Sequence, residues 1–359
     1  MSIHRMSNRA SSMKTSIWSK LALVVLGLIV SGQACSISIG SSVRPDGGVF
    51  RSVDRGQTWT QKNFVQVDKK RTVSLDDVTG RVLAFNPTNS DQLYLGTLAN
   101  GIWVTTNGGD QWRPTSLRSG AYDCLVFDPL NPQVMYTAAG QQVLKSIDAG
   151  QTWTTVYTES QPAQAVNCVI VDPVDDRQVW ATTSGGKVLL SEDYGQRWTL
   201  VSSVPALQPR QLYISADGLI YIFSRTNGIY RSDTRGRTWT DLTPALQKYS
   251  GATDIRAVSL TADRWFLGTA YGLLKSEDRG VSWSPVPTLV TAGSIPIQSV
   301  AVNPKNTQEI FVTTDRRLHR TVDGGASWSV STLPTGRIPT LLTFDPARSE
   351  RLYFTTFKP

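Results

Sequence analysis

The fold is decided by the stretch Val143–Trp153, which reads VLKSIDAGQTW. Its core is the pattern Ser-x-Asp-x-Gly-x-x-Trp, and the chain carries seven copies of that pattern. The other six copies are Ser52-Asp54-Gly56-Trp59, Thr105-Asn107-Gly109-Trp112, Ser191-Asp193-Gly195-Trp198, Ser232-Thr234-Gly236-Trp239, Ser276-Asp278-Gly280-Trp283 and Thr321-Asp323-Gly325-Trp328. Successive tryptophans are 41 to 53 residues apart, a period typical of propellers and solenoids.

Each residue of the pattern has a structural use in a tight turn. Asp and Ser or Thr side chains hydrogen-bond to the nearby backbone, Gly accepts a positive φ angle, and Trp brings a large apolar area. The alternative is an acidic metal or catalytic site, but such a site is not usually repeated sevenfold. We therefore interpret the copies as structural turns. In one copy Thr234 replaces the Asp and Asp233 precedes it, so this turn is expected to be held differently.

Alternating residues before each turn, as in Gly101–Thr105 and Gly228–Ser232, predict a strand, so the turn belongs to a hairpin. Two further strands are expected in each repeat. The predicted inner strands are Val82–Pro87, Cys124–Pro129, Cys168–Pro173, Gln211–Gly218, Ile255–Asp263, Ser299–Pro304 and Leu341–Pro346. The second strands are Leu93–Thr97, Val134–Ala138, Val179–Thr183, Leu219–Ser224, Arg264–Thr269, Ile310–Thr314 and Leu352–Thr356.

The order of these elements predicts how the fold closes. The first hairpin, 48–60, has no inner strands before it, and the last inner pair, 340–356, has no turn pattern after it. Together they complete one blade. The prediction is an all-β, seven-bladed propeller of four-stranded blades whose last blade is built from both chain ends, which removes an exposed sheet edge.

The pattern resembles the Asp-box repeat, also called the bacterial neuraminidase repeat. That repeat occurs in sialidases, in family 74 glycoside hydrolases that cleave xyloglucan, in sortilin ectodomains and in the photosystem II stability and assembly factor family. The resemblance covers nearly all of residues 49–356. It is specific for the fold and unspecific for function.

Residues 1–34 are predicted to be a signal peptide. They contain four basic residues and no acidic one, followed by an apolar run from Leu21 to Val30 that is too short to span a bilayer. Met13 is an alternative start. Cys35 follows the small residue Ala34, which resembles a lipoprotein junction, although Gly32 stands where leucine is usual. Lipidation of Cys35, simple secretion and an uncleaved anchor stay open, and each makes the protein exported.

Beyond the signal peptide we expect a linker, 35–48, and one propeller domain, 49–359. Removal of residues 1–34 leaves 32 basic and 28 acidic side chains, a net charge of +4 that is too mild to indicate nucleic-acid binding. Cys124 and Cys168 occupy equivalent positions in consecutive repeats. We expect them to be buried and too far apart for a disulfide, which needs Cα atoms within about 7 Å.

The expected ligand face carries the links between repeats, because loops on a rigid scaffold usually hold the function. The longest link, 61–80, is either a binding loop or an insertion. Several arginines lie near inner-strand entries, where they could line the central channel and bind carboxylates. Ordinary surface arginines paired with Asp or Glu are the alternative. The predicted partner-binding residues are Arg118, Arg210, Arg225, Arg256, Tyr271, Arg316 and Arg337.

An enzyme is the less favoured interpretation. The sialidases need a Tyr–Glu pair, and only Glu159 lies in a link on the expected ligand face. The family 74 hydrolases work in a cleft between two propellers, and this chain predicts one. His4 and His319 stand alone, so no metal or other cofactor is expected. We expect a monomeric, non-catalytic, exported scaffold that binds a protein or acidic glycan. A glycan-acting hydrolase of sialidase or family 74 type is the alternative.

Overall fold

The structure is a computed structural model that describes residues 46–65, 73–205, 208–262 and 264–357. The predicted signal peptide, Cys35 and most of the predicted linker lie outside the described residues. Within the described residues no helix is long and apolar enough to cross a membrane.

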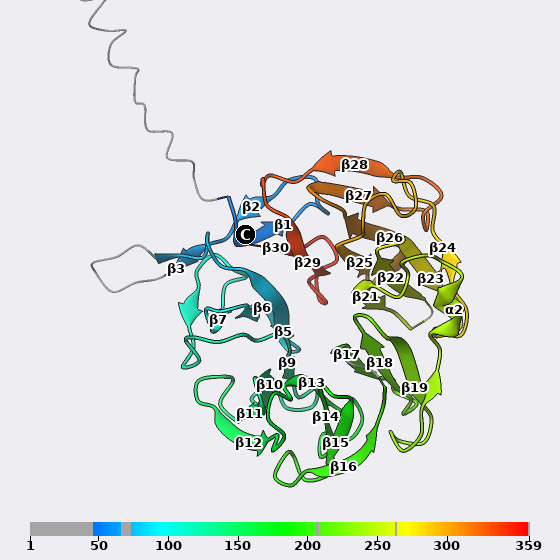
Figure 1. Cartoon of the computed structure of the whole chain (residues 1–359). Helices are drawn as coiled ribbons and strands as arrows, with labels where there is room; N and C mark the ends of the chain where they lie inside the picture. The colour runs from blue at the N-terminus through cyan, green and yellow to red at the C-terminus, as the bar shows by residue number, and fades with distance from the viewer. Residues whose placement is uncertain (1–45, 66–72, 206–207, 263, 358–359) are drawn as a thin grey trace, which may run out of the picture. The chain divides into compact units, whose positions relative to one another are not determined.

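Seven four-stranded antiparallel sheets form a propeller ring, as predicted (Figure 1). Blades 1 to 3 are β5–β8 (Gly80–Asn86, Asn89–Thr97, Ile102–Thr105, Arg113–Pro114), β9–β12 (Leu125–Phe127, Met135–Ala139, Gln142–Ser146, Thr154–Thr158) and β13–β16 (Val166–Val171, Val179–Thr183, Lys187–Ser191, Thr199–Ser203). Blades 4 to 6 are β17–β20 (Pro209–Ile214, Ile220–Ser224, Gly228–Ser232, Thr240–Asp241), β21–β24 (Ile255–Leu260, Trp265–Thr269, Leu273–Ser276, Ser284–Pro285) and β25–β28 (Ser299–Asn303, Asn306–Thr313, Arg317–Thr321, Ser329–Thr332). A short helix, α2 (Pro244–Gln247), follows β20.

Blade 7 is built from both ends of the ring, which confirms the predicted closure. Its strand order is β29 (Pro339–Phe344), β30 (Leu352–Thr356), β1 (Val49–Ser52) and β2 (Thr60–Gln61). Strand β1 pairs antiparallel with β30, so that Val49 lies opposite Thr355 and Ser52 lies opposite Leu352. Every residue of β30 is buried, because the strand has a ladder on each side and a neighbouring blade on each face.

The turns are held by their own side chains. In the copy from Ser146 to Trp153, the Ser146 hydroxyl accepts a hydrogen bond from the Gly150 amide at 2.8 Å and donates one to Asp148 at 2.7 Å. Asp148 also accepts bonds from the amide and hydroxyl of Thr152, at 2.8 and 2.6 Å. Burial would raise the pKa of Asp148, but the bonds from Thr152 and Ser146 lower it to about 2. Gly150 has a φ of 77°.

The turn with Thr234 keeps the same hydrogen-bond pattern. The Thr238 amide donates to Thr234 Oγ1 at 2.9 Å, and the Gly236 amide donates to Ser232 Oγ at 2.8 Å. The Thr234 hydroxyl therefore accepts the backbone hydrogen bond that the Asp148 carboxylate accepts in its own turn. The expectation that this turn is held differently is wrong.

The pattern tryptophans differ in burial. Trp112 and Trp283 are fully buried, while Trp59, Trp153, Trp198, Trp239 and Trp328 are partly buried. In four copies the indole nitrogen donates to the carbonyl of the glycine in its own turn, at 3.0–3.1 Å; these are Trp153, Trp198, Trp239 and Trp283. These tryptophans therefore close their own turn as well as filling space.

Five of the seven turns also contact an aromatic residue of the preceding blade, a contact that the sequence analysis missed. Tyr136 of β10 donates its hydroxyl to the Tyr194 carbonyl at 2.9 Å, and a Cβ added to Gly195 would lie 3.1 Å from the Tyr136 ring. Tyr353 of β30 likewise donates to the Gly108 carbonyl of blade 1 at 3.0 Å. The turn glycine is therefore needed for close packing between blades as well as for its φ angle.

The long link 61–80 contains structure that was not predicted. Strand β3 (Phe64–Val65) pairs with β4 (Val73–Ser74) as a small hairpin, and Val65 forms a parallel bridge with Trp112. The Trp112 indole donates to the Lys62 carbonyl at 2.7 Å. The start of the link is therefore tied to blade 1. The basic run Lys69–Arg71 lies outside the described residues.

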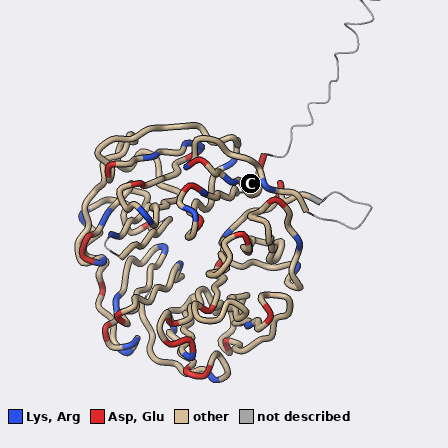
Figure 2. The backbone as a smooth tube through the Cα atoms, turned by 180° about the vertical axis from the view of Figure 1, so that it is seen from behind, with Lys and Arg blue, Asp and Glu red and all other residues tan. Residues whose placement is uncertain are grey.

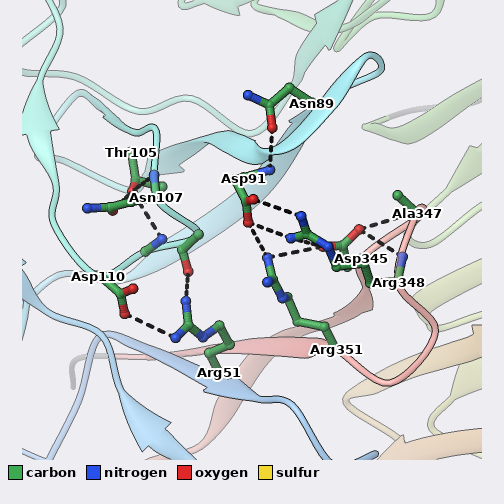
Figure 3. A network of polar contacts seen from close by, with 12 residues as sticks. Arg51, Asn89, Asp91, Thr105, Asn107, Asp110, Asp345, Ala347, Arg348 and Arg351 are labelled. Carbon is green, nitrogen blue, oxygen red and sulfur yellow. Dashed lines mark hydrogen bonds and ion pairs between the residues drawn. The ribbon is translucent and has the colours of Figure 1, made fainter.

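A network of charges spans the seam between blade 7 and blade 1 (Figure 3). Asp91 of β6 receives a two-bond contact from Arg348, at 2.5 and 2.8 Å, and a third bond from Arg351 at 2.5 Å. Arg351 also lies 3.4 Å from buried Asp345. Arg51 of β1 donates to the Gly108 carbonyl at 2.7 Å and to Asp110 at 3.0 Å. Both chain ends are thus fastened to blade 1.

Asp91→Asn is expected to lower the free energy of unfolding by about 1–2 kcal/mol, because charged hydrogen bonds are lost at a partly screened site. The bonds from Arg348 and Arg351 hold the pKa of Asp91 well below its usual range. A lowered pKa stabilises the fold above the unfolded-state value of about 3.9. The difference between wild type and variant, measured by urea unfolding, should therefore stay constant near neutral pH and shrink below about pH 4. A pH-independent difference would contradict this account.

Trp112→Ala is expected to cost about 3–5 kcal/mol of unfolding free energy, the usual range for a buried Trp truncated to Ala. Asp148→Ala should cost less, about 1 kcal/mol, because only local hydrogen bonds are lost. Thermal and denaturant unfolding of both variants measures this order. The structural interpretation of the turns fails if Asp148→Ala leaves stability unchanged but removes ligand binding.

Candidate functional site

The inner strands begin with a bulge in five of the seven blades. The ladder between inner and second strand shifts by one residue at the strand entry. A bulge redirects the side chain of the extra residue away from the regular alternation. The extra residues are Arg81, Asn167, Arg210, Arg256 and Thr340. Three of these five are arginines, and two of them, Arg210 and Arg256, are predicted partner-binding residues.

Arg210 is the centre of a cationic cluster. Arg210 is exposed to solvent, but the protein atoms crowded around its guanidinium lower its pKa first, the charges of Arg225 and Arg81 lower it further, and Asp123 acts in the opposite direction. Arg81 donates to Asp123 at 2.6 Å, which leaves Arg210 and Arg225 as the surplus positive charge. Neither has a side-chain hydrogen bond or ion pair with another residue that the structure describes. We call Arg81, Arg210, Arg225 and Asp123 the Arg210 cluster.

The cluster unites residues that are far apart in the sequence. Arg81 lies in β5 of blade 1, Asp123 precedes the inner strand of blade 2, Arg210 lies at the entry of β17 in blade 4, and Arg225 follows β18. The charges of the other three act on Arg210 because the inner strands surround one channel. An unpaired guanidinium fork is suited to bind a carboxylate through two parallel hydrogen bonds.

Two other predicted arginines are already occupied. Arg337 donates to Asp46 and Asp77, each at 3.0 Å, and to the Asp76 carbonyl at 2.9 Å, and its side chain is only 16% exposed. Arg256 makes a two-bond contact with Asp254, at 3.1 and 2.8 Å. For these two the alternative interpretation, arginine paired with an acidic neighbour, fits better. Arg337 instead fastens the start of the propeller to blade 7.

The remaining predicted residues, Arg118, Tyr271 and Arg316, are not among the main charges that act on Arg210. Arg118 is exposed beside a hollow that Tyr94 and Gly150 also line. Tyr271 lines an apolar pocket of about 240 Å³. Arg316 is exposed and lies 3.8 Å from Asp315.

The charges as a whole do not form one large patch. Figure 2, which views the ring from behind, shows Lys and Arg interspersed with Asp and Glu around all blades. The Arg210 cluster is therefore distinguished by its place at the channel and by two arginines, Arg210 and Arg225, that lack a side-chain partner within the part of the chain that the structure describes, not by the density of basic residues.

A Tyr–Glu pair is present, although the sequence analysis expected none. The Tyr157 hydroxyl of β12 donates to Glu159 at 3.0 Å, and Lys187 donates to the other carboxylate oxygen at 2.8 Å. Burial and the Glu159 charge raise the pKa of Tyr157 to about 12, so the phenol is neutral. The Glu159 side chain has no exposed surface. The pair lies at the outer strand of blade 2, so this arrangement serves blade packing better than nucleophilic attack.

The described residues contain no candidate metal-binding site. Across the described ranges, no three His, Cys, Asp or Glu side chains gather as a metal-binding group. His319 is buried, and burial lowers its pKa.

Comparison with known proteins shows similarity to xyloglucanases and to YCF48. No model of a known protein family matches it. A xyloglucanase from Hypocrea jecorina is 27% identical over 261 residues, which are 67% of this chain and 29% of that protein. Xyloglucanase Xgh74A from Acetivibrio thermocellus is 24% identical over 293 residues, 79% of this chain and 28% of that protein. The chain thus spans less than a third of the length of these curated relatives.

Solved structures share the propeller fold. The GH74 xyloglucanase from Xanthomonas campestris aligns with a TM-score of 0.63 and 21% identity, covering 78% of this chain and 51% of that one. YCF48 bound to a D1 peptide aligns with a TM-score of 0.62 and 14% identity, covering 78% of this chain and 93% of that one. The fold is therefore common to a xyloglucanase and to a protein that binds a peptide.

Proposed function

We propose that this chain is an exported, non-catalytic propeller that binds a protein partner at the cell envelope. The Arg210 cluster would receive carboxylates of the partner. The observation that carries the proposal is a pair of guanidiniums without a side-chain partner among the described residues, Arg210 at the entry of β17 and Arg225 directly after β18.

The structural alignments support a binding protein over an enzyme of xyloglucanase type. The alignment takes up 93% of the YCF48 chain but only 51% of the Xanthomonas xyloglucanase. The described residues form one ring, which leaves about half of that enzyme without a counterpart. YCF48 was seen with a bound peptide, and a peptide ligand offers carboxylates to the Arg210 cluster.

We further infer that the seven turns are Asp-boxes. Their residues, spacing and internal hydrogen bonds fit that repeat, as the copy at Ser146 illustrates. Asp-boxes stabilise a fold that several functions share, so this inference supports the architecture and leaves the ligand to the Arg210 cluster.

The alternative is a glycan-acting hydrolase. The sequence similarity to xyloglucanases favours it, since two of them align with two thirds or more of this chain. The deciding assay is direct. Purified protein incubated with xyloglucan or with a fluorogenic sialoside should release no product, and turnover that is lost on Arg210→Ala would replace the binding proposal with an enzyme.

The double variant Arg210→Ala, Arg225→Ala should lose its partner. If each charged contact contributes about 1.5–3 kcal/mol, affinity falls by about a hundredfold or more. Binding should also weaken with salt, because partly exposed charges are screened over about 8–10 Å. A pull-down from envelope extract identifies the partner, and titration calorimetry with that partner measures the loss.

The matched control is Arg118→Ala, Arg316→Ala, which removes the same charge from two exposed arginines outside the cluster. It should bind like the wild type, and both double variants should keep the wild-type melting temperature. Equal loss in the two variants would mean that net charge, not the cluster, governs binding, and full binding by the Arg210 variant would place the site elsewhere.

We also propose that the exported protein is anchored through a lipidated Cys35. A lipid-modified bacterial cysteine carries several acyl chains, and stable anchoring needs more than one. Cys35→Ser should move the protein from the membrane fraction to the soluble fraction, which immunoblotting of fractionated cells measures. An unmodified amino terminus at Cys35 in the wild type, detected by mass spectrometry, would favour simple secretion.

A further inference from the structure

Cys124 and Cys168 lie against each other at the inner strands of blades 2 and 3. Cys124 directly precedes β9, and Cys168 lies within β13. The Cys124 thiol donates to the Val169 carbonyl and accepts from the Val169 amide, both at 3.1 Å. Val169 follows Cys168 in the chain, so the Cys124 sulfur touches the backbone beside its partner cysteine. Both thiols are free, but the expectation that they lie too far apart for a disulfide is not supported by these contacts.

The two thiols differ in access and in acidity. Cys124 is partly exposed, whereas Cys168 is 3% exposed and its sulfur lies 3.7 Å from the Pro209 carbonyl. The side-chain interaction between them lowers the pKa of Cys124 and raises that of Cys168, and burial adds to the second effect. The residue with the lowered pKa is thus the one that is partly exposed, which is the order that an attacking and a resolving cysteine require.

We propose that Cys124 and Cys168 form a redox-active dithiol, which a peroxide oxidises to a disulfide between the inner strands of blades 2 and 3. The Cys124 thiolate attacks one peroxide oxygen, the O–O bond breaks, and with one proton the products are Cys124 sulfenic acid and water. The Cys168 thiol then attacks the Cys124 sulfur, the S–O bond breaks, and the second water leaves with the Cys168 proton. Two thiols lose two hydrogens, and the peroxide is reduced to two waters.

The disulfide would join two blades that otherwise meet through packing and strand-edge contacts. It closes a loop that contains the whole of blade 2, and a long closed loop restricts the unfolded chain. The oxidised protein should therefore resist thermal unfolding better than the reduced protein. The dithiol adjoins the Arg210 cluster, since Asp123 directly precedes Cys124 and the Cys168 sulfur lies 3.7 Å from the carbonyl of Pro209, but its chemistry does not depend on the proposed partner.

The test uses the full chain with Cys35→Ser, so that two cysteines remain. Hydrogen peroxide should lower the intact mass by two hydrogens, abolish labelling of both thiols by iodoacetamide under denaturing conditions, and raise the melting temperature. Dithiothreitol should reverse all three changes. An unchanged thiol content, irreversible oxidation to sulfinic acid, or a disulfide between two chains would each overturn the proposal.

Single substitutions in the same background test the assigned order. In Cys168→Ser, dimedone should trap a sulfenic acid on Cys124 after peroxide treatment, because the resolving thiol is missing. In Cys124→Ser, buried Cys168 should be labelled much more slowly. Equal or faster trapping at Cys168 would contradict the roles, and the mass change of the two-cysteine protein tests the disulfide even where a serine variant folds poorly.

Discussion

The structure depends on the ladder between β1 and β30, which joins residues three hundred or more positions apart. Without it, blade 7 would consist of two separate hairpins, each with an exposed edge. Closing the ring early is entropically costly because the contacts span most of the chain, so we expect the ladder and the charges at Asp91 to form late in folding. The seam between blade 7 and blade 1 thus lies beside the strand pairing with the largest separation in sequence, and it also carries several charged hydrogen bonds.

Much of the architecture follows from local patterns in the sequence. The Ser-x-Asp-x-Gly-x-x-Trp turns give the number of blades, and the unpaired first hairpin and last strand pair indicate how the ring closes. Contacts between blades were harder to foresee. The Tyr136 hydroxyl reaches the turn of the next blade, but nothing in the local sequence distinguishes this tyrosine from any other buried aromatic residue. Position within a strand predicts burial, whereas the partner depends on the packing of separate repeats.

The candidate site was predicted only in part, for the same reason. Arginines at strand entries can be found in the sequence, but the sequence does not show which acidic residue each one meets. Arg337 meets Asp46 and Asp77 from the other end of the chain, and Arg256 meets Asp254 two residues before it. Arg210 has no such neighbour among the described residues, and this property, which only the three-dimensional arrangement reveals, sets it apart. The Tyr157–Glu159 pair was missed because the sequence analysis considered on which face of the ring each glutamate lies. It did not consider that two residues separated by two positions along a strand point to the same side.

The bulges at the inner-strand entries separate the identity of the residues at the channel from the packing of the blade core, two properties that are usually linked in a β-sheet. In a regular ladder, a residue that faces the channel is held in register with residues of the core. A substitution at such a position therefore also affects the packing of the core. The surplus residue of a bulge stands outside that register, so Arg81, Arg210 and Arg256 can differ between blades while the packing beneath them stays the same. The other two surplus residues, Asn167 and Thr340, hydrogen-bond to the Pro209 and Gly80 carbonyls of other blades. The ring therefore offers a row of replaceable positions around its channel. A lineage could exchange one ligand for another by altering this row alone, and a designer could do the same without repacking a blade.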